Sequence, residues 1–262
     1  MNADNPYQPP ATNVDITANK SEDVWAFVEP QKMSAGRGLG WIADGFRFFG
    51  RDPGIWVVIT IIYLIILMLS SLIPFATNIL QPMLAGGLMI GVHQQDNGQP
   101  LEIKHLFDGF ENAAGKLATL GALLIGLIIL MYIGVAILGI AAAIIASIAE
   151  QKGNLSPIVI IITLIVGIPI LSTALLVTMS VSWFGPPLVI LHDLSVGEAF
   201  KMSLLGLKRN ILPIIIFTFF FMLLFIAATV FTLTLGLLVI IPVMMGASYA
   251  SWKDVFTRAN VY

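Results

Sequence analysis

The sequence predicts an all-α integral membrane protein with six transmembrane helices, and three observations support this fold class. The chain of 262 residues is 58% hydrophobic and only 11% charged, whereas a soluble domain is typically about one quarter charged. Long stretches, such as residues 53–92 and 211–250, contain no charged side chain. The 13 Lys and Arg residues are distributed unevenly: if the chain crosses the membrane six times, 12 of them lie on one side.

The lengths of the uncharged stretches set the number of helices. About 20 residues are enough to span a hydrocarbon core of roughly 30 Å, so residues 53–92 must contain a turn, which we expect near Pro74 and Asn78. Residues 211–250 divide in the same way. With the middle of the chain included, the sequence predicts helices near 54–73, 76–94, 117–149, 157–185, 211–231 and 236–252.

The third and fourth predicted helices depart from the standard length. Residues 117–149 would extend roughly 50 Å at 1.5 Å per residue, so this helix must tilt, kink or project beyond the bilayer. Ser156 and Pro157 are suited to the N-cap and first position of the fourth helix. That helix is expected to end near Gly185, before two prolines, with a bent continuation to Leu191.

The positive charges predict the orientation of the chain. Lys152, in the turn between the third and fourth helices, is the only positive charge on its side of the six-crossing path. The other 12 lie before the first helix, in the two connections on the same side, or after the sixth helix. Because cytoplasmic loops are enriched in Lys and Arg, both termini are predicted to be cytoplasmic.

Three amphipathic segments, 40–51, 103–116 and 196–209, each precede a pair of predicted transmembrane helices. Their apolar residues recur at helical spacing, so we expect each segment to lie in the headgroup plane before the chain enters the membrane. Ser195 and Glu198 have the spacing of a capping box at the start of the third segment. The prediction is therefore three transmembrane hairpins, each preceded by a short amphipathic interfacial helix.

The three units also share short sequence features that suggest a repeat. The tripeptide Asp44-Gly45-Phe46 recurs as Asp108-Gly109-Phe110. The spacing of 29 residues between Pro53 and Pro82 recurs between Pro213 and Pro242, and this register aligns Gly86 with Gly246. The alternative is chance similarity between apolar hairpins.

The chain is expected to have two parts. Residues 1–35 are rich in Pro, Asn and acidic residues and predict a disordered cytoplasmic tail, and residues 36–262 form the transmembrane domain. Trp25, Phe27 and Val28 are apolar exceptions within the tail that could dock on the membrane surface. Residues 1–33 do not resemble a signal peptide, and the lack of cysteine excludes disulfides and thiolate metal sites.

The histidines His93, His105 and His192 all fall at predicted cytoplasmic membrane edges. Asp96 and Asp193 are close in sequence, so a metal site is one interpretation. Their spacing matches no known zinc pattern, and polar anchoring at the interface is the favoured interpretation. We therefore assign no metal, catalytic or cofactor-binding residue.

Within the predicted spans the polar groups are hydroxyls and phenols rather than charges, which argues against proton-coupled transport. The fourth helix has the richest group, where bonding back to the helix backbone or to adjacent helices is the favoured interpretation and a cavity lining is the alternative. The group on the fourth helix consists of Ser172, Thr173, Thr178, Ser180 and Ser182. The other hydroxyls and phenols of the spans include Thr60, Tyr63, Ser70, Tyr132 and Thr163.

Gly87 and Gly91 form a G-x-x-x-G pattern on the second helix, which serves either internal packing or a homo-oligomer contact. The prolines Pro82, Pro169 and Pro242 are expected to kink three helices. The chain contains no nucleophile-elbow, zinc-protease or phosphate-loop motif. Its cytoplasmic segments have mixed charge, so a nucleic-acid partner is not expected.

Three stretches have a distinctive sequence: residues 35–42, residues 85–89 leading to 106–110, and residues 248–256. Together they resemble a family of proteobacterial inner-membrane proteins with no assigned activity. The family is distantly similar to YciC-like proteins and to the membrane domain of some glycerophosphodiester phosphodiesterases. The resemblance implies a Gram-negative inner membrane, and it carries over no substrate or catalytic residue.

Two function classes follow from these features. The first is a non-enzymatic membrane protein that acts through helix packing or contact with membrane lipids, in envelope maintenance. The second is a transporter or channel for a neutral or lipid-like substrate, suggested by the proline-containing helices and the hydroxyls of the fourth helix. An intramembrane enzyme would require a metal held by His93 and His192.

Overall fold

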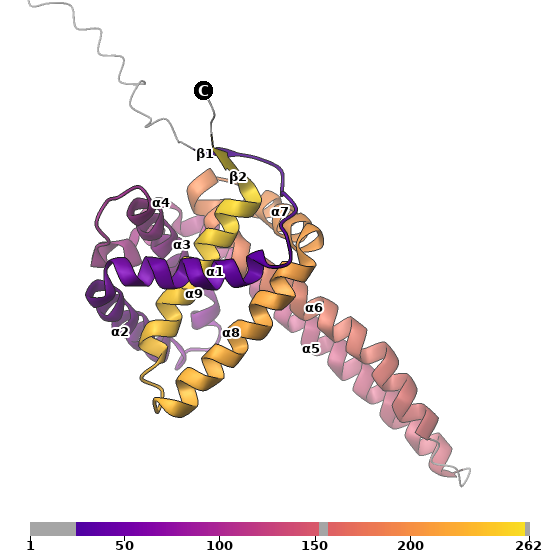
Figure 1. Ribbon diagram of the computed structural model, residues 1–262. Coiled ribbons are helices and arrows are strands. Elements are labelled where there is room, and N and C mark those ends of the chain that lie inside the picture. Colours follow the sequence, from indigo (N-terminus) through magenta and orange to yellow (C-terminus); the bar gives the residue numbers. More distant parts are fainter. Residues whose placement is uncertain (1–24, 152–156, 260–262) are drawn as a thin grey trace, which may run out of the picture.

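The computed structural model describes residues 25–151 and 157–259, which are almost entirely helical (Figure 1). Two short strands, β1 (Trp25–Phe27) and β2 (Thr257–Ala259), lie at the ends of the described chain, and a short 3₁₀-helix, η1, covers Ile103–Leu106. The α-helices are α1 (Arg37–Arg51), α2 (Pro53–Ser70), α3 (Ala76–Asp96), α4 (Asp108–Asn112), α5 (Ala114–Gln151), α6 (Pro157–His192), α7 (Val196–Arg209), α8 (Ile211–Phe231) and α9 (Leu237–Phe256).

The six long apolar helices occur where the sequence predicts them, with shifted ends. The first of them ends at Ser70 rather than near residue 73, so the turn before α3 covers residues 71–75, where Phe75 adopts a positive φ of 65°. The fourth predicted helix does not end near Gly185, because α6 continues through Pro186 and Pro187 to His192. Phe184, Leu188 and Val189 are buried around the two prolines, so packing compensates for the backbone hydrogen bonds that proline removes.

The second amphipathic segment is not the single helix predicted for residues 103–116. It divides into η1, α4 and the first turn of α5. Ala113 leaves the helical region, with φ −149° and ψ 31°, and so separates α4 from α5. The other two amphipathic segments are continuous helices, and Ser195 and Glu198 form the predicted capping box at the start of α7.

Residues 25–35 are ordered, which corrects the prediction of a disordered tail as far as residue 35. Strand β1 pairs antiparallel with β2, with Phe27 opposite Thr257. The Asn210 side chain receives a hydrogen bond from the Met33 backbone and donates one to the Gln31 carbonyl oxygen, at 2.7 and 2.8 Å. The prediction for residues 1–24 falls outside the described residues.

Helices α3 and α9 form the centre of the fold. Helix α9 contacts α1, α2, α3, α6 and α8, and α1 lies across it (Figure 1). Large side chains such as Trp41, Trp56, Phe184 and Tyr249 are fully buried around these helices.

Four other helices, α2, α5, α6 and α8, are long and apolar enough to cross a membrane, and they expose many large apolar side chains.

Two glycines allow amphipathic segments to contact the central helices at the backbone. A Cβ atom on Gly45 of α1 would lie 2.2 Å from the Val243 carbonyl oxygen of α9, and one on Gly109 of α4 would lie 2.0 Å from the Met83 carbonyl oxygen of α3. Met83 and Val243 each follow a proline of the predicted repeat. The repeated tripeptide therefore corresponds to a repeated packing contact.

The third amphipathic helix makes a similar contact with a different helix. Helix α7 packs on α6, where the Ser180 hydroxyl donates a 2.7 Å hydrogen bond to the Ser203 carbonyl oxygen. Each amphipathic segment thus lies against a long helix other than the one directly after it in the chain: α1 on α9, α4 on α3, and α7 on α6. The amphipathic segments are therefore parts of the helical core rather than peripheral attachments.

Helices α5 and α6 extend together away from the remaining helices (Figure 1). Helix α5 has 38 residues, which corresponds to roughly 57 Å at 1.5 Å per residue. Large apolar side chains in its second half, including Leu130, Ile137 and Ile140, are exposed. The excess length predicted from the sequence is therefore a real feature of the fold.

Candidate functional site

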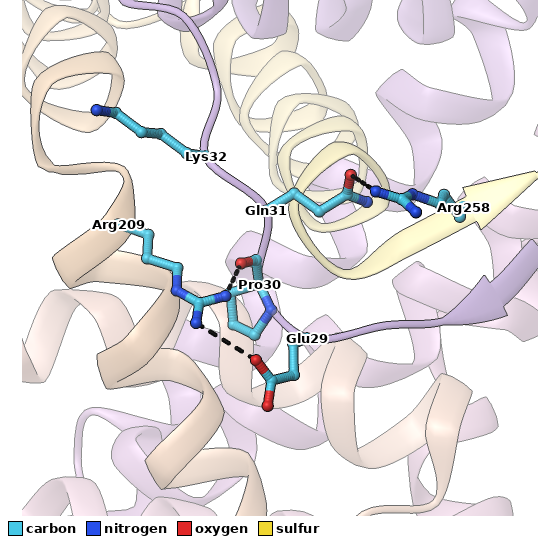
Figure 2. Close-up of a pocket in the computed structure, with 6 residues that line it drawn as sticks. All are labelled: Glu29, Pro30, Gln31, Lys32, Arg209 and Arg258. Carbon is cyan, nitrogen blue, oxygen red and sulfur yellow. Dashed lines mark hydrogen bonds and ion pairs between the residues drawn. The ribbon is translucent and has the colours of Figure 1, made fainter.

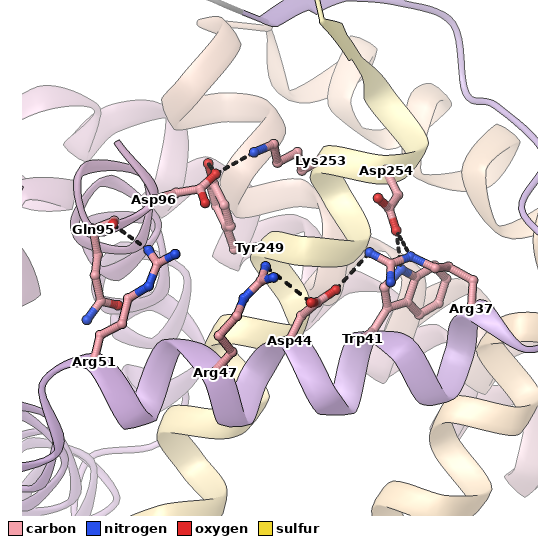
Figure 3. A network of polar contacts seen from close by, with 10 residues as sticks. All are labelled: Arg37, Trp41, Asp44, Arg47, Arg51, Gln95, Asp96, Tyr249, Lys253 and Asp254. Atoms are coloured by element: carbon pink, nitrogen blue, oxygen red, sulfur yellow. Dashed lines mark hydrogen bonds and ion pairs between the residues drawn. The ribbon is translucent and has the colours of Figure 1, made fainter. Parts of the chain in front are cut away.

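A network of polar side chains forms where α1 crosses the end of α9 (Figure 3). Asp254 accepts hydrogen bonds from Arg37 Nε and from Trp41 Nε1, the latter at 2.8 Å. Arg37 also pairs with Asp44 at 2.7 Å, and Arg47 pairs with the same carboxylate at 3.2 Å. The hydrogen bond to Asp254 is the main cause that raises the pKa of Arg37.

The network continues to the end of α3. Lys253 pairs with Asp96 at 2.5 Å, and the Tyr249 hydroxyl donates to the same carboxylate at 3.1 Å. Arg51 donates to the Gln95 carbonyl oxygen, and the Gln95 side chain donates to Asp52. The start and end of α1 are thereby joined to α9 and α3, respectively.

The charges in this network balance. It contains four basic side chains, Arg37, Arg47, Arg51 and Lys253, and four carboxylates, Asp44, Asp52, Asp96 and Asp254. Hydrogen bonds to charged groups contribute about 1.5 to 3 kcal/mol each when partly buried. The arrangement is therefore suited to holding three helices together at one end of the fold.

The three histidines occupy separate positions and bind protein groups. His93 Nδ1 lies 3.0 Å from the Tyr249 hydroxyl. The His192 ring packs between Phe27 and Trp252, with ring centroids 4.6 and 5.1 Å away. His105 is fully buried in η1. Within the two described ranges, no three His, Asp or Glu side chains are grouped to hold a metal ion, so the metal interpretation gains no support.

His105 makes the stability of the fold depend on pH. Its Nδ1 accepts a hydrogen bond from the Glu102 backbone at 3.1 Å, which requires the neutral ring. Burial lowers the pKa of His105 below its ordinary value of 6.5. As the pH falls below about 6.5, the unfolded chain binds a proton that the folded chain does not, and stability should fall by at most about 1.4 kcal/mol per pH unit.

The variant His105→Gln tests this prediction, because glutamine at this position can still receive the Glu102 backbone hydrogen bond. We expect thermal unfolding in detergent between pH 7 and pH 5.5 to depend less on pH in His105→Gln than in the original protein. The control His93→Gln should retain the dependence. An unchanged pH profile in His105→Gln would assign the effect to another group.

The hydroxyls of the fourth predicted helix bond to backbone oxygens, as the favoured interpretation predicts. Thr173 and Thr178 donate to carbonyl oxygens four residues earlier, at 2.7 and 2.9 Å, and Ser172 donates to Pro169 at 3.1 Å. Ser180 reaches α7. The side chain of Thr163 lies outside the described residues. Four hydroxyls of this group, those of Ser172, Thr173, Thr178 and Ser180, therefore have backbone oxygens as partners.

Gly87 and Gly91 pack against other parts of the same chain. A Cβ atom on Gly87 would lie 2.4 Å from the His105 carbonyl oxygen, and one on Gly91 would lie 2.8 Å from the Leu101 side chain. Both glycines are buried. These contacts support the internal-packing interpretation, because η1 and Leu101 lie against the two glycines.

A second polar feature lies beside the N-terminal segment that follows β1 (Figure 2). It is an open depression of about 560 Å³ lined by Glu29, Pro30, Gln31, Lys32, Arg209 and Arg258, which we call the basic depression. The sequence reasoning missed it, because residues 29–32 were assigned to the disordered tail. The apolar group Trp25, Phe27 and Val28 was the available signal that this segment is anchored.

The fold indicates a general class of protein. The described chain is all-α, and its four exposed apolar helices are consistent with a multi-pass membrane protein. No protein-family model matches the chain, and no curated protein or solved structure is significantly similar to it.

Proposed function

We propose that the chain is an inner-membrane protein with six crossings, both termini in the cytoplasm, and three amphipathic helical segments on the cytoplasmic side. In this proposal the crossings are α2, α3, α5, α6, α8 and α9, paired as three hairpins. The sequence resemblance to proteobacterial inner-membrane proteins supports the choice of membrane.

The central position of α3 and α9 supports six crossings rather than four. These helices have 21 and 20 residues, or roughly 30 Å at 1.5 Å per residue, which matches the hydrocarbon core. They are less apolar than the other four, but each of their residues is buried or partly buried and none is exposed. A helix that is surrounded by protein does not need a surface suited to lipid.

The ion pairs are the observation that carries the proposal. Arg37 pairs with Asp254 and Lys253 with Asp96, which joins the N-terminal segment, the C-terminal segment and the end of α3. Within the described ranges, two further ion pairs join such segments, Lys116 with Asp193 and Arg209 with Glu29. Every one of these pairs joins two segments that the six-crossing path places on the cytoplasmic side, although the sequence argument used no information about contacts.

We propose further that the protein is not an enzyme and acts through helix packing and contact with membrane lipids, in maintenance of the cell envelope. The balanced polar network and the exposed apolar surfaces of α5, α6 and α8 support this function. Of the hydroxyls that suggested a transporter, those of Ser172, Thr173, Thr178 and Ser180 are bonded to backbone oxygens, so no specific observation favours that alternative.

Reporter fusions test the topology. A fusion after Tyr262 should report a cytoplasmic location, and a fusion near Gly153 should report a periplasmic one. The control is a fusion at the Asn97-Gly98 turn after α3, which should report the cytoplasm. A periplasmic C-terminus would reject six crossings.

Loss of the gene tests the function. We expect its removal to change envelope lipid composition or permeability to hydrophobic dyes, with restoration by the intact gene. Unchanged lipids and permeability would reject the envelope role while leaving the topology intact.

A further inference from the structure

The basic depression is formed by three segments that are far apart in the sequence. Arg209, at the end of α7, donates to the Pro30 carbonyl oxygen and lies 3.3 Å from the Glu29 carboxylate. Arg258 in β2 donates to the Gln31 side chain at 3.3 Å. Lys32 is exposed and points away from these contacts (Figure 2). The pairing of β1 with β2 brings these side chains together.

This depression carries an excess of positive charge, unlike the network around α1. Its lining holds three basic side chains, those of Lys32, Arg209 and Arg258, and a single carboxylate, that of Glu29, whose side chain is 76% exposed. An ion pair with such an exposed partner is weak, so an incoming anion can compete for Arg209. Lys208, next to Arg209 on the exposed side of α7, adds a further positive charge nearby.

An exposed apolar surface begins directly after Arg209. Ile211, Leu212 and Ile215 at the start of α8 are about half exposed. Arg209 therefore lies at the junction between a charged surface and a helix that is apolar enough to cross the membrane. This is the arrangement that a phospholipid requires, with its phosphate on cationic side chains and its acyl chains along an apolar helix.

We propose that the basic depression binds the phosphate headgroup of an anionic membrane phospholipid, with the acyl chains lying along the start of α8. This inference rests on the proposed membrane function and names the lipid class and the site. Arg209 supplies a bidentate donor for the phosphate, and Lys32 and Arg258 supply the remaining charge. Three parts of the chain meet at this site: the N-terminal segment, the end of α7 and the C-terminal segment. Lipid binding therefore also stabilises their association.

The test uses the full-length protein in a neutral detergent. Phosphatidylglycerol or phosphatidylcholine with the same acyl chains is added, and bound lipid is counted by native mass spectrometry. We expect a preference for phosphatidylglycerol that falls roughly fivefold in Lys32→Gln and roughly 25-fold in the double variant Lys32→Gln/Arg258→Gln, since each basic residue contributes about fivefold near an anionic surface.

Two controls separate this site from general surface charge. Lys32→Arg keeps the charge and should keep the preference. Lys201→Gln removes an exposed charge of α7 outside the depression and should also leave the preference unchanged. An equal loss in Lys201→Gln, or no preference in the original protein, would overturn the proposal.

A competition experiment identifies the source of the phosphate group. Inorganic phosphate and glycerol phosphate at the lipid's concentration should not displace phosphatidylglycerol, because they lack acyl chains. Displacement by either would overturn the assignment to a lipid. A cytoplasmic C-terminal fusion combined with no lipid preference would reject this inference alone, whereas a periplasmic C-terminus would reject the proposed function.

Discussion

Replacing Gly45 or Gly109 with alanine should be among the most destabilising single changes in the chain. The added methyl group would lie 2.2 Å from the Val243 oxygen in one case and 2.0 Å from the Met83 oxygen in the other. Backbone oxygens cannot rotate away as side chains do, so the helices themselves must separate. We expect a loss of about 3 kcal/mol or more for each variant, measured as unfolding in detergent monitored by size-exclusion chromatography.

Gly50→Ala provides the matched control. Gly50 lies on the same helix as Gly45, and a Cβ atom there would meet nothing within 4 Å. Since alanine favours the helix over glycine, this variant should be neutral or more stable by up to about 1 kcal/mol. Equal stability of Gly45→Ala and Gly50→Ala would show that α1 does not lie against α9 as described.

The second large effect is expected for Asp254→Asn. This change removes the negative charge of a carboxylate whose Oδ2 accepts from both Arg37 and Trp41, so the ion pair with Arg37 is lost and only one oxygen is left to accept. Trp41 is 1% exposed, so its indole N–H cannot turn to water instead. We expect a loss of about 2 to 3 kcal/mol, measured in the same unfolding assay, together with greater protease sensitivity of the N-terminal segment.

Asp193→Asn is the control for Asp254→Asn, because it removes a carboxylate charge at an exposed position. Asp193 pairs with Lys116 at 2.7 Å, but its side chain is 91% exposed, against 24% for Asp254. Asparagine also tolerates the positive φ of 55° at this position. The change should cost less than about 1 kcal/mol. If both variants lost the same stability, burial would not be the reason for the importance of Asp254.

Most helices could be predicted from the sequence because lipid-facing segments have a strong composition signal. The range 211–231 matches α8, and the range 196–209 matches α7. The end of α6 could not be predicted, because proline usually ends a helix and only the burial of Phe184 and Leu188 explains the continuation. Helix α9 also extends four residues beyond its predicted end at residue 252, since its last turn lies within the core.

The candidate sites were less predictable than the helices. Asp44, Asp96 and Asp254 are far apart in the sequence, and nothing in their local patterns indicates that α1 would bring them to one network. The basic depression depends on residues 29–32, whose polar composition resembles that of a disordered tail. Pairing with β2 orders this segment, and a short two-stranded pairing leaves almost no trace in sequence periodicity.

The sequence by itself determined which segments are apolar enough for lipid and which carry the positive charges, because both properties belong to individual residues and their spacing. It also indicated the repeat through Gly45 and Gly109. Only the tertiary structure decided that α3 and α9 form the centre, that the amphipathic segments pack against α9, α3 and α6, and that strand β1 pairs with β2. The physical reason is that a helix surface contacts lipid or protein with similar apolar side chains, so its composition does not specify which neighbour covers it.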